Sequence, residues 1–178
     1  LKYHDIPNTV ETACSEAASL GVKMLTIHAS GGSEMCKAAV KGAKEGAAKS
    51  GKTPPIILGV TVLTSMNEVT LKEVGVNNTV ESQVVNLARM AINNGVSGIV
   101  CSALEVKKLK SEIKNKFVAV VPGIRMSEGD AGDQKRIATP DSALKDGADY
   151  LVIGRPVYGA NDPVKALNDI YTLTAKVK

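Results

Sequence analysis

The sequence predicts an α/β fold in which helices cover a parallel sheet. Its short β-branched runs are almost wholly apolar, which is typical of strands buried on both faces. Helical patterns lie between these runs, and no linker or low-complexity stretch interrupts the alternation. These observations predict one domain over residues 1–178, a length sufficient for a sizeable core.

Each element has its own signal. Strands are expected in the apolar runs at residues 22–29, 55–63, 97–103, 116–124 and 149–155, with residues 1–4 as the end of a sixth. Helices are expected at residues 10–20, 32–48 and 80–92, and again from Pro140 and from Pro163. Gly21 supplies the C-terminal stop of the first helix. Thr139 and Asp162 precede the two prolines as N-caps.

Polar and glycine residues follow nearly every expected strand, in the segments HASGG, TVLTSM, CSA, PGIR and GRP. A (β/α)8 TIM barrel would gather them on one rim, the C-terminal face where the active sites of such barrels lie. A Rossmann-type sheet is disfavoured because neither a GxGxxG loop nor a P-loop is found. Since a barrel has eight strands and about 250 residues, we expect its first two strand–helix units and part of its third strand to precede Leu1.

Composition argues against two classes of partner. The net charge is only +4, and the basic residues at 107–110 are mixed with Glu105 and Glu112, which we interpret as a solvated face. One Phe, four Tyr and no Trp offer few stacking platforms for nucleic acid. No apolar run reaches membrane length. Three cysteines without metal-type spacing fit reduced thiols, so a cytoplasmic protein is expected.

The loops after the last two strands predict a phosphate site. Gly154 lets the backbone approach an anion, Arg155 can bind it bidentately, and Arg125 ends the preceding strand. Barrels often build phosphate sites from the loops after strands seven and eight. Residues 127–136 have the composition of a lid, in which Gln134 could donate to a phosphate or a ring carbonyl. The alternatives are a surface arginine beside a turn glycine and an ordinary solvated loop.

Lys2 and Asp5 form the candidate catalytic pair. A lysine held by carboxylates at the mouth of a barrel is a poised proton donor. The strand is expected to end near His4, which leaves Asp5 on a turn from which it can reach the rim or a neighbouring subunit. The alternative is a surface salt bridge.

Three further residues stand at strand ends. Thr64 could bond a polar ligand ring or cap the next helix. His28 is interpreted as a packing histidine, although an acid–base role is chemically available. Cys101 ends a buried strand and is expected to be a small core residue.

In order along the chain, the motifs LKYHDIPNTV, HASGG, VTVLTSM, VCSA, PGIR, DQKR and DYLVIGRP resemble those of the orotidine 5′-phosphate decarboxylase family. The resemblance extends from Leu1 to the last helix. The family signature at the first motif is Asp-x-Lys-x-x-Asp, of which Lys2 and Asp5 match the last two members. Its first aspartate would stand immediately before Leu1. The family's first two strands, which carry an aspartate contacting the ribose and a second lysine, would come earlier still.

The resemblance implies decarboxylation of orotidine 5′-monophosphate to UMP in de novo pyrimidine biosynthesis, without metal or organic cofactor. Lys2 would protonate C6 of the pyrimidine as the carboxylate leaves, and Asp5 would enter the partner's site across a homodimer interface. The resemblance also implies substrate-binding roles for Ile6 and Thr9 beside Asp5, for Thr64 at the pyrimidine, and for Arg125, Gln134, Gly154 and Arg155 at or beside the phosphate.

Two other functions stay open. An enzyme similar to 3-keto-L-gulonate 6-phosphate decarboxylase would share the barrel and a similar motif but use a metal-stabilised enediolate; magnesium dependence would favour it, and the LTSM and DQKR segments disfavour it. The other is a barrel fragment that binds phosphate without catalysis. Six strands cannot close an eight-stranded barrel, and open sheet edges associate readily.

Overall fold

The computed structural model describes residues 1–126, 136–175 and 177. The chain folds into two compact units, between which it crosses several times. The first unit comprises Leu1–Thr61, Ser82–Val100 and Asn115–Val118, and the second comprises Val62–Glu81, Cys101–Lys114 and Ala119–Lys178. The expectation of one domain over residues 1–178 stays a prediction.

The first unit is built on parallel strands that pair in the order of the sequence. They are β1 (Lys2–Tyr3), β2 (Met24–His28), β3 (Ile56–Val60) and β4 (Gly98–Val100). The register pairs Lys2 with Thr26, and it pairs His28 at the end of β2 with Val60 at the end of β3. Each strand lies inside the apolar run that predicted it. Because the strands are parallel, the segments that follow them leave at the same edge.

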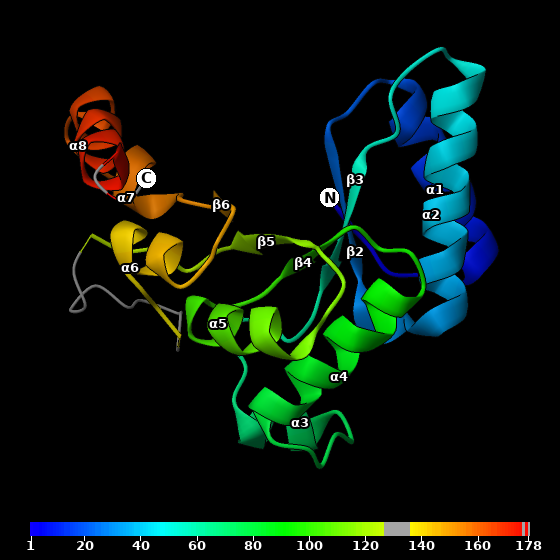
Figure 1. Cartoon of the computed structure of the whole chain (residues 1–178), viewed down its shortest axis with the longest axis horizontal. Helices are drawn as coiled ribbons and strands as arrows, with labels where there is room; N and C mark the ends of the chain where they lie inside the picture. Colours follow the sequence, from blue (N-terminus) through cyan, green and yellow to red (C-terminus); the bar gives the residue numbers. More distant parts are fainter. Residues whose placement is uncertain (127–135, 176, 178) are drawn as a thin grey trace. The chain divides into compact units, whose positions relative to one another are not determined.

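Helices α1 (Pro7–Ser19) and α2 (Gly32–Lys49) lie side by side in the first unit (Figure 1). A one-turn helix, η1 (Ala29–Gly31), joins β2 to α2, and α4 (Val80–Asn93) precedes β4. Helix α1 has Pro7 at its first position and is followed by Gly21 with a φ of +80°, as the sequence predicts. The helices expected at residues 32–48 and 80–92 are confirmed to within one residue.

The contact between α1 and α2 is a contact of backbones. A Cβ on Gly42 would overlap the carbonyl oxygen of Glu11, and a Cβ on Gly46 would overlap that of Ser15. Cys14 of α1 and Ala43 of α2 are among the small residues buried with these glycines. Glycine at both positions therefore sets the distance between the two helices.

The second unit holds residues 119–121 of β5 (Val118–Val121), of which Val120 and Val121 pair in parallel with β6 (Tyr150–Leu151). Its helices are α3 (Glu68–Glu73), α5 (Ala103–Glu112), α6 (Pro140–Lys145), α7 (Arg155–Tyr158) and α8 (Pro163–Ala175). Within the described residues, no helix is long and apolar enough to cross a membrane.

Only some of the helix starts in the second unit agree with those predicted from the sequence. The carboxylate of Asp162 accepts from the Lys165 N–H at 2.9 Å, so the predicted cap of α8 is confirmed. Helix α6 begins at Pro140 as expected, but the Thr139 hydroxyl donates to Asp141 instead of accepting from the helix. Helices α3 and α5 were not predicted. Both begin with capping boxes, in which the N-cap and N3 side chains each bond the other's backbone N–H.

We expect Gly42→Ala and Gly46→Ala each to destabilise the fold by about 1–3 kcal/mol, because the added methyl group overpacks a backbone contact. At an exposed helix position the same change would instead stabilise by about 1 kcal/mol. Urea unfolding measures the difference. Lys44→Ala, at an exposed position between the two glycines, is the control and should change stability by less than about 0.5 kcal/mol. A gain in stability in either glycine variant would contradict the contact.

Candidate functional site

The predicted catalytic residues lie together where β1 passes into α1. Lys2 is exposed on β1, and Asp5 follows the strand as predicted. The Asp5 carboxylate accepts a 2.7 Å hydrogen bond from the N–H of Ile6, which fixes the turn before the helix. Ile6 is 67% exposed, and Thr9 is exposed in the first turn of α1. Ile6, Thr9 and the Asp5 carboxylate are therefore all open at the surface of the first unit.

A pair of stacked histidines lies beside Lys2. The rings of His4 and His28 are 5.3 Å apart between centroids and inclined by 27°. Burial, the neighbouring His4 and the ammonium of Lys2 together lower the pKa of His28 below its ordinary value. His28 is therefore neutral near pH 7, in keeping with the packing role that the sequence suggested.

Thr64 and Arg125 lie in the second unit, and both are buried. Thr64 follows β3 and is only 8% exposed. Arg125 is 5% exposed. Its side-chain Nη1 donates to the carbonyl oxygen of Ile124 at 2.9 Å, and its main-chain N–H donates to the carbonyl oxygen of Ala138. At least part of the Arg125 guanidinium thus bonds its own loop.

The other predicted phosphate residues lie in the segment after β6. Gly154 is the N-cap of α7, where a Cβ would approach the ring of Tyr158 to 3.0 Å. Arg155 is exposed at the first position of that helix. Gln134 lies outside the described residues, as do all but the last residue of the predicted lid.

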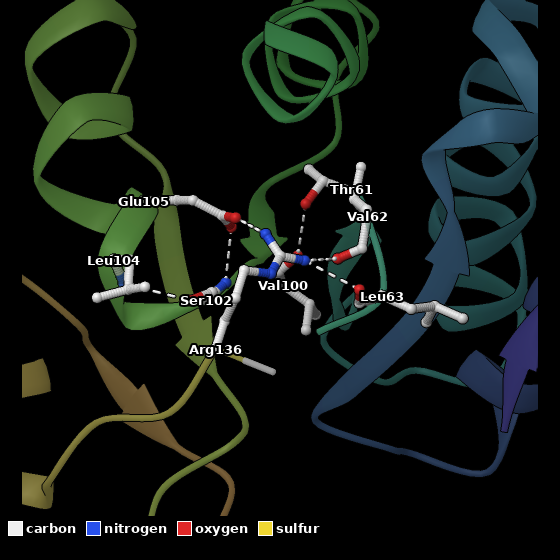
Figure 2. A network of polar contacts seen from close by, with 8 residues as sticks. All are labelled: Thr61, Val62, Leu63, Val100, Ser102, Leu104, Glu105 and Arg136. Carbon is white, nitrogen blue, oxygen red and sulfur yellow. Dashed lines mark hydrogen bonds and ion pairs between the residues drawn. The ribbon is translucent and has the colours of Figure 1, made fainter. Parts of the chain in front are cut away.

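A polar network in the second unit is centred on Arg136 (Figure 2). Its Nη1 forms an ion pair with Glu105, and its Nη2 donates to the carbonyl oxygens of Val62 at 3.1 Å and Leu63 at 2.9 Å. The other oxygen of Glu105 accepts from the Ser102 N–H at 2.8 Å. Burial lowers the pKa of Arg136 from its ordinary value, but arginine stays charged at any physiological pH.

This network corrects one interpretation from the sequence. The charge pattern places Glu105 on a solvated face, yet it is 7% exposed and paired with Arg136, whose side chain is 12% exposed. The spacing Ser102-x-x-Glu105 is the signature of a capping box and could have shown that this glutamate faces the backbone. No local signal marks Arg136, because its partners lie far away along the chain.

The remaining titratable groups bear on the site only indirectly. Cys101 is 1% exposed, which confirms it as a core residue, and this burial raises the pKa of its thiol to about 12. In the part of the chain that the structure describes, no group of three or more His, Cys, Asp or Glu side chains is placed to hold a metal ion.

The lowered pKa of His28 predicts a pH-dependent stability. The unfolded chain takes up this proton near the ordinary pKa of 6.5, whereas the folded chain takes it up only at lower pH. The unfolded state therefore binds more protons in this window, and stability falls as the pH drops through 6.5. We expect His28→Gln to lose less unfolding free energy than the wild type between about pH 7.5 and pH 5.5. An equal loss in both proteins would contradict the assignment.

Comparison with known proteins gives one family. Residues 1–170 match the model of the orotidine 5′-phosphate decarboxylase / HUMPS family. The chain is 51% identical over 170 residues to orotidine 5′-phosphate decarboxylase of Pseudoalteromonas translucida, covering 96% of this chain and 71% of that protein. It is 50% identical over 171 residues to the enzyme of that name from Neisseria meningitidis serogroup B, covering 96% and 68%.

Solved structures give the same result. The crystal structure of orotidine 5′-phosphate decarboxylase from Lactobacillus acidophilus matches with a TM-score of 0.84 and 40% identity, over 98% of this chain and 73% of that one. The enzyme from Pyrococcus horikoshii matches with a TM-score of 0.68 and 21% identity, over 98% and 72%, and so supports the fold alone. The predicted α/β barrel class is therefore confirmed.

Proposed function

Because the chain belongs to the orotidine 5′-phosphate decarboxylase / HUMPS family, we propose a division of roles among its residues for the decarboxylation of orotidine 5′-monophosphate. The activity is that of a carboxy-lyase of pyrimidine biosynthesis, which releases CO2 and leaves UMP. The observation that carries this function is sequence identity: about half of the aligned residues, over 96% of the chain, are identical to those of curated decarboxylases. The keto-gulonate phosphate and non-catalytic alternatives are not favoured.

We assign proton donation to Lys2. When the bond between C6 and the carboxylate breaks, its electron pair stays on C6 and CO2 departs. An ammonium fixed beside C6 stabilises this charge and then transfers its proton to the carbon, which gives UMP. The exposure of Lys2, the first residue of β1, leaves its ammonium open to a ligand.

Asp5 is proposed to act across a homodimer interface, in the partner's site. Its support is the open position of the carboxylate at the β1–α1 turn, with exposed Ile6 and Thr9 beside it. A two-fold axis would give both sites the same arrangement, with each subunit contributing an aspartate to the other. We also propose that this dimer is cytoplasmic and that each subunit is a single barrel domain.

Substrate binding is proposed for two groups in the second unit. Thr64 contacts the pyrimidine, and the Gly154 backbone with Arg155 and Gln134 binds the phosphate. Arg125 is assigned a supporting role in its loop, because its guanidinium bonds the Ile124 carbonyl. The phosphate is remote from the bond that breaks, so its binding energy can hold the ring in the reactive position.

The role of Lys2 predicts a specific loss. In the complete enzyme, Lys2→Ala should lower kcat for orotidine 5′-monophosphate by about 1,000-fold or more, since both the charge and the proton are removed. UMP should still bind, as measured by calorimetry. Lys23→Ala, which removes an exposed lysine just before β2, is the control and should leave turnover unchanged. Near-normal turnover in Lys2→Ala would exclude Lys2 as the proton donor.

The role of Asp5 predicts recovery of activity on mixing. Lys2→Ala and Asp5→Ala dimers are each expected to be nearly inactive, whereas a heterodimer of the two has one site with both residues intact. Equal mixing with free exchange makes half the dimers heterodimers, so about a quarter of the wild-type activity should return. If subunit exchange is verified by mass spectrometry and no activity returns, Asp5 does not act across the interface.

A further inference from the structure

We propose that Arg136 is a positioning residue for the pyrimidine side of the site. It fixes the main chain of Val62 and Leu63 and thereby holds Thr64 in place. The inference rests on the proposed contact of Thr64 with the substrate ring. It adds a residue that touches neither substrate nor reacting atoms and that acts through the turn carrying Thr64.

The bonds of Arg136 fall on two successive carbonyl groups. One nitrogen, Nη2, donates to Val62 at 3.1 Å and to Leu63 at 2.9 Å (Figure 2). These residues follow the last residue of β3 by two and three positions. A planar guanidinium can serve both carbonyls and a carboxylate at once, which the single ammonium of a lysine cannot reproduce in the same geometry.

Glu105 fixes the other side of the guanidinium. The side chains of Arg136 and Glu105 are 12% and 8% exposed, so loss of either partner would leave a buried charge uncompensated. Glu105 is itself held by the capping box of α5, because its second oxygen accepts from Ser102. Arg136 is therefore anchored, through Glu105, to the start of α5.

Thr64 lies inside the turn that Arg136 holds. The carbonyl oxygen of Leu63 also accepts from the N–H of Met66 at 2.9 Å, which closes the turn around Thr64. Because the Leu63 peptide is bonded directly to Thr64, a rotation of that peptide changes the direction of the hydroxyl of Thr64, which is buried in the turn. Loss of the Arg136 bonds would leave the turn free to relax while the rest of the unit stays folded.

A double-mutant cycle in the complete enzyme tests this inference. We expect Arg136→Lys to lower kcat/KM for orotidine 5′-monophosphate by about 10- to 100-fold, the scale of a misplaced contact. Thr64→Val should cause a loss of similar size. When Arg136→Lys is added to the Thr64→Val protein, kcat/KM should fall by less than about a further 3-fold, because the residue through which Arg136 acts has already been removed.

A merely structural role gives a different result. If Arg136 only supports the fold, its loss lowers the melting temperature and the two substitutions multiply their effects on kcat/KM. Multiplied effects would overturn the inference, as would a Thr64→Val protein with normal kcat/KM. A wild type that does not turn over orotidine 5′-monophosphate would instead refute the proposed function, so the two failures are distinguishable.

Two further variants complete the design. Glu105→Gln retains an oxygen for the Ser102 N–H but removes the charge that holds Arg136, so it should reproduce the Arg136→Lys pattern and serve if that protein does not fold. Lys108 lies on α5, as Glu105 does, and forms an ion pair with Glu81 of α4 through exposed side chains. Lys108→Met removes this ion pair. It should leave kcat/KM within about 2-fold. A loss in Lys108→Met equal to that in Glu105→Gln would overturn the specific role of the network.

Discussion

Parallel strand pairing is the constraint on which the candidate site depends. Antiparallel neighbours would alternate the edges at which the chain leaves the sheet, whereas parallel neighbours need a return helix and leave at the same edge each time. In the first unit this pairs Lys2 of β1 with Thr26 of β2 and brings His4, which follows β1, beside His28 at the end of β2. The His4–His28 stack is a direct product of that pairing. The apolar runs that form the strands therefore also decide which polar side chains meet.

The two units place charge in opposite settings. Lys2 is exposed, so its ammonium is open to an anionic ligand, and its charge is one cause of the lowered pKa of His28. Arg136 is only 12% exposed and is already bound by Glu105 and by two carbonyl groups, so its charge is neutralised within the protein. A cation of the first kind suits chemistry on a ligand, and one of the second kind suits the fixing of backbone dipoles.

Sequence patterns predicted what depends on near neighbours. The apolar runs of β3, β4 and β5 bury consecutive residues, as expected for strands covered on both faces, whereas buried and half-buried residues alternate in β2. The stop at Gly21 and the cap at Asp162 act within a few positions. The helices α3 and α5 were missed because their sequence signal is a capping box, formed by the N-cap and N3 residues, and not a long apolar stripe. Glu105 was misjudged for another reason: its burial depends on a pairing with Arg136 that no local pattern records.

The glycines of α2 have a mechanical consequence for the turn before α1. Helix α1 starts two residues after Asp5, and Gly42 and Gly46 contact it at Glu11 and Ser15, about two and three helical turns from Asp5. Touching backbones leave no side chain to flex between them. The two helices are thus expected to move as one rigid body, with Asp5 just before the start of α1. The position of α2 then determines how far the Asp5 carboxylate can extend toward a neighbouring molecule.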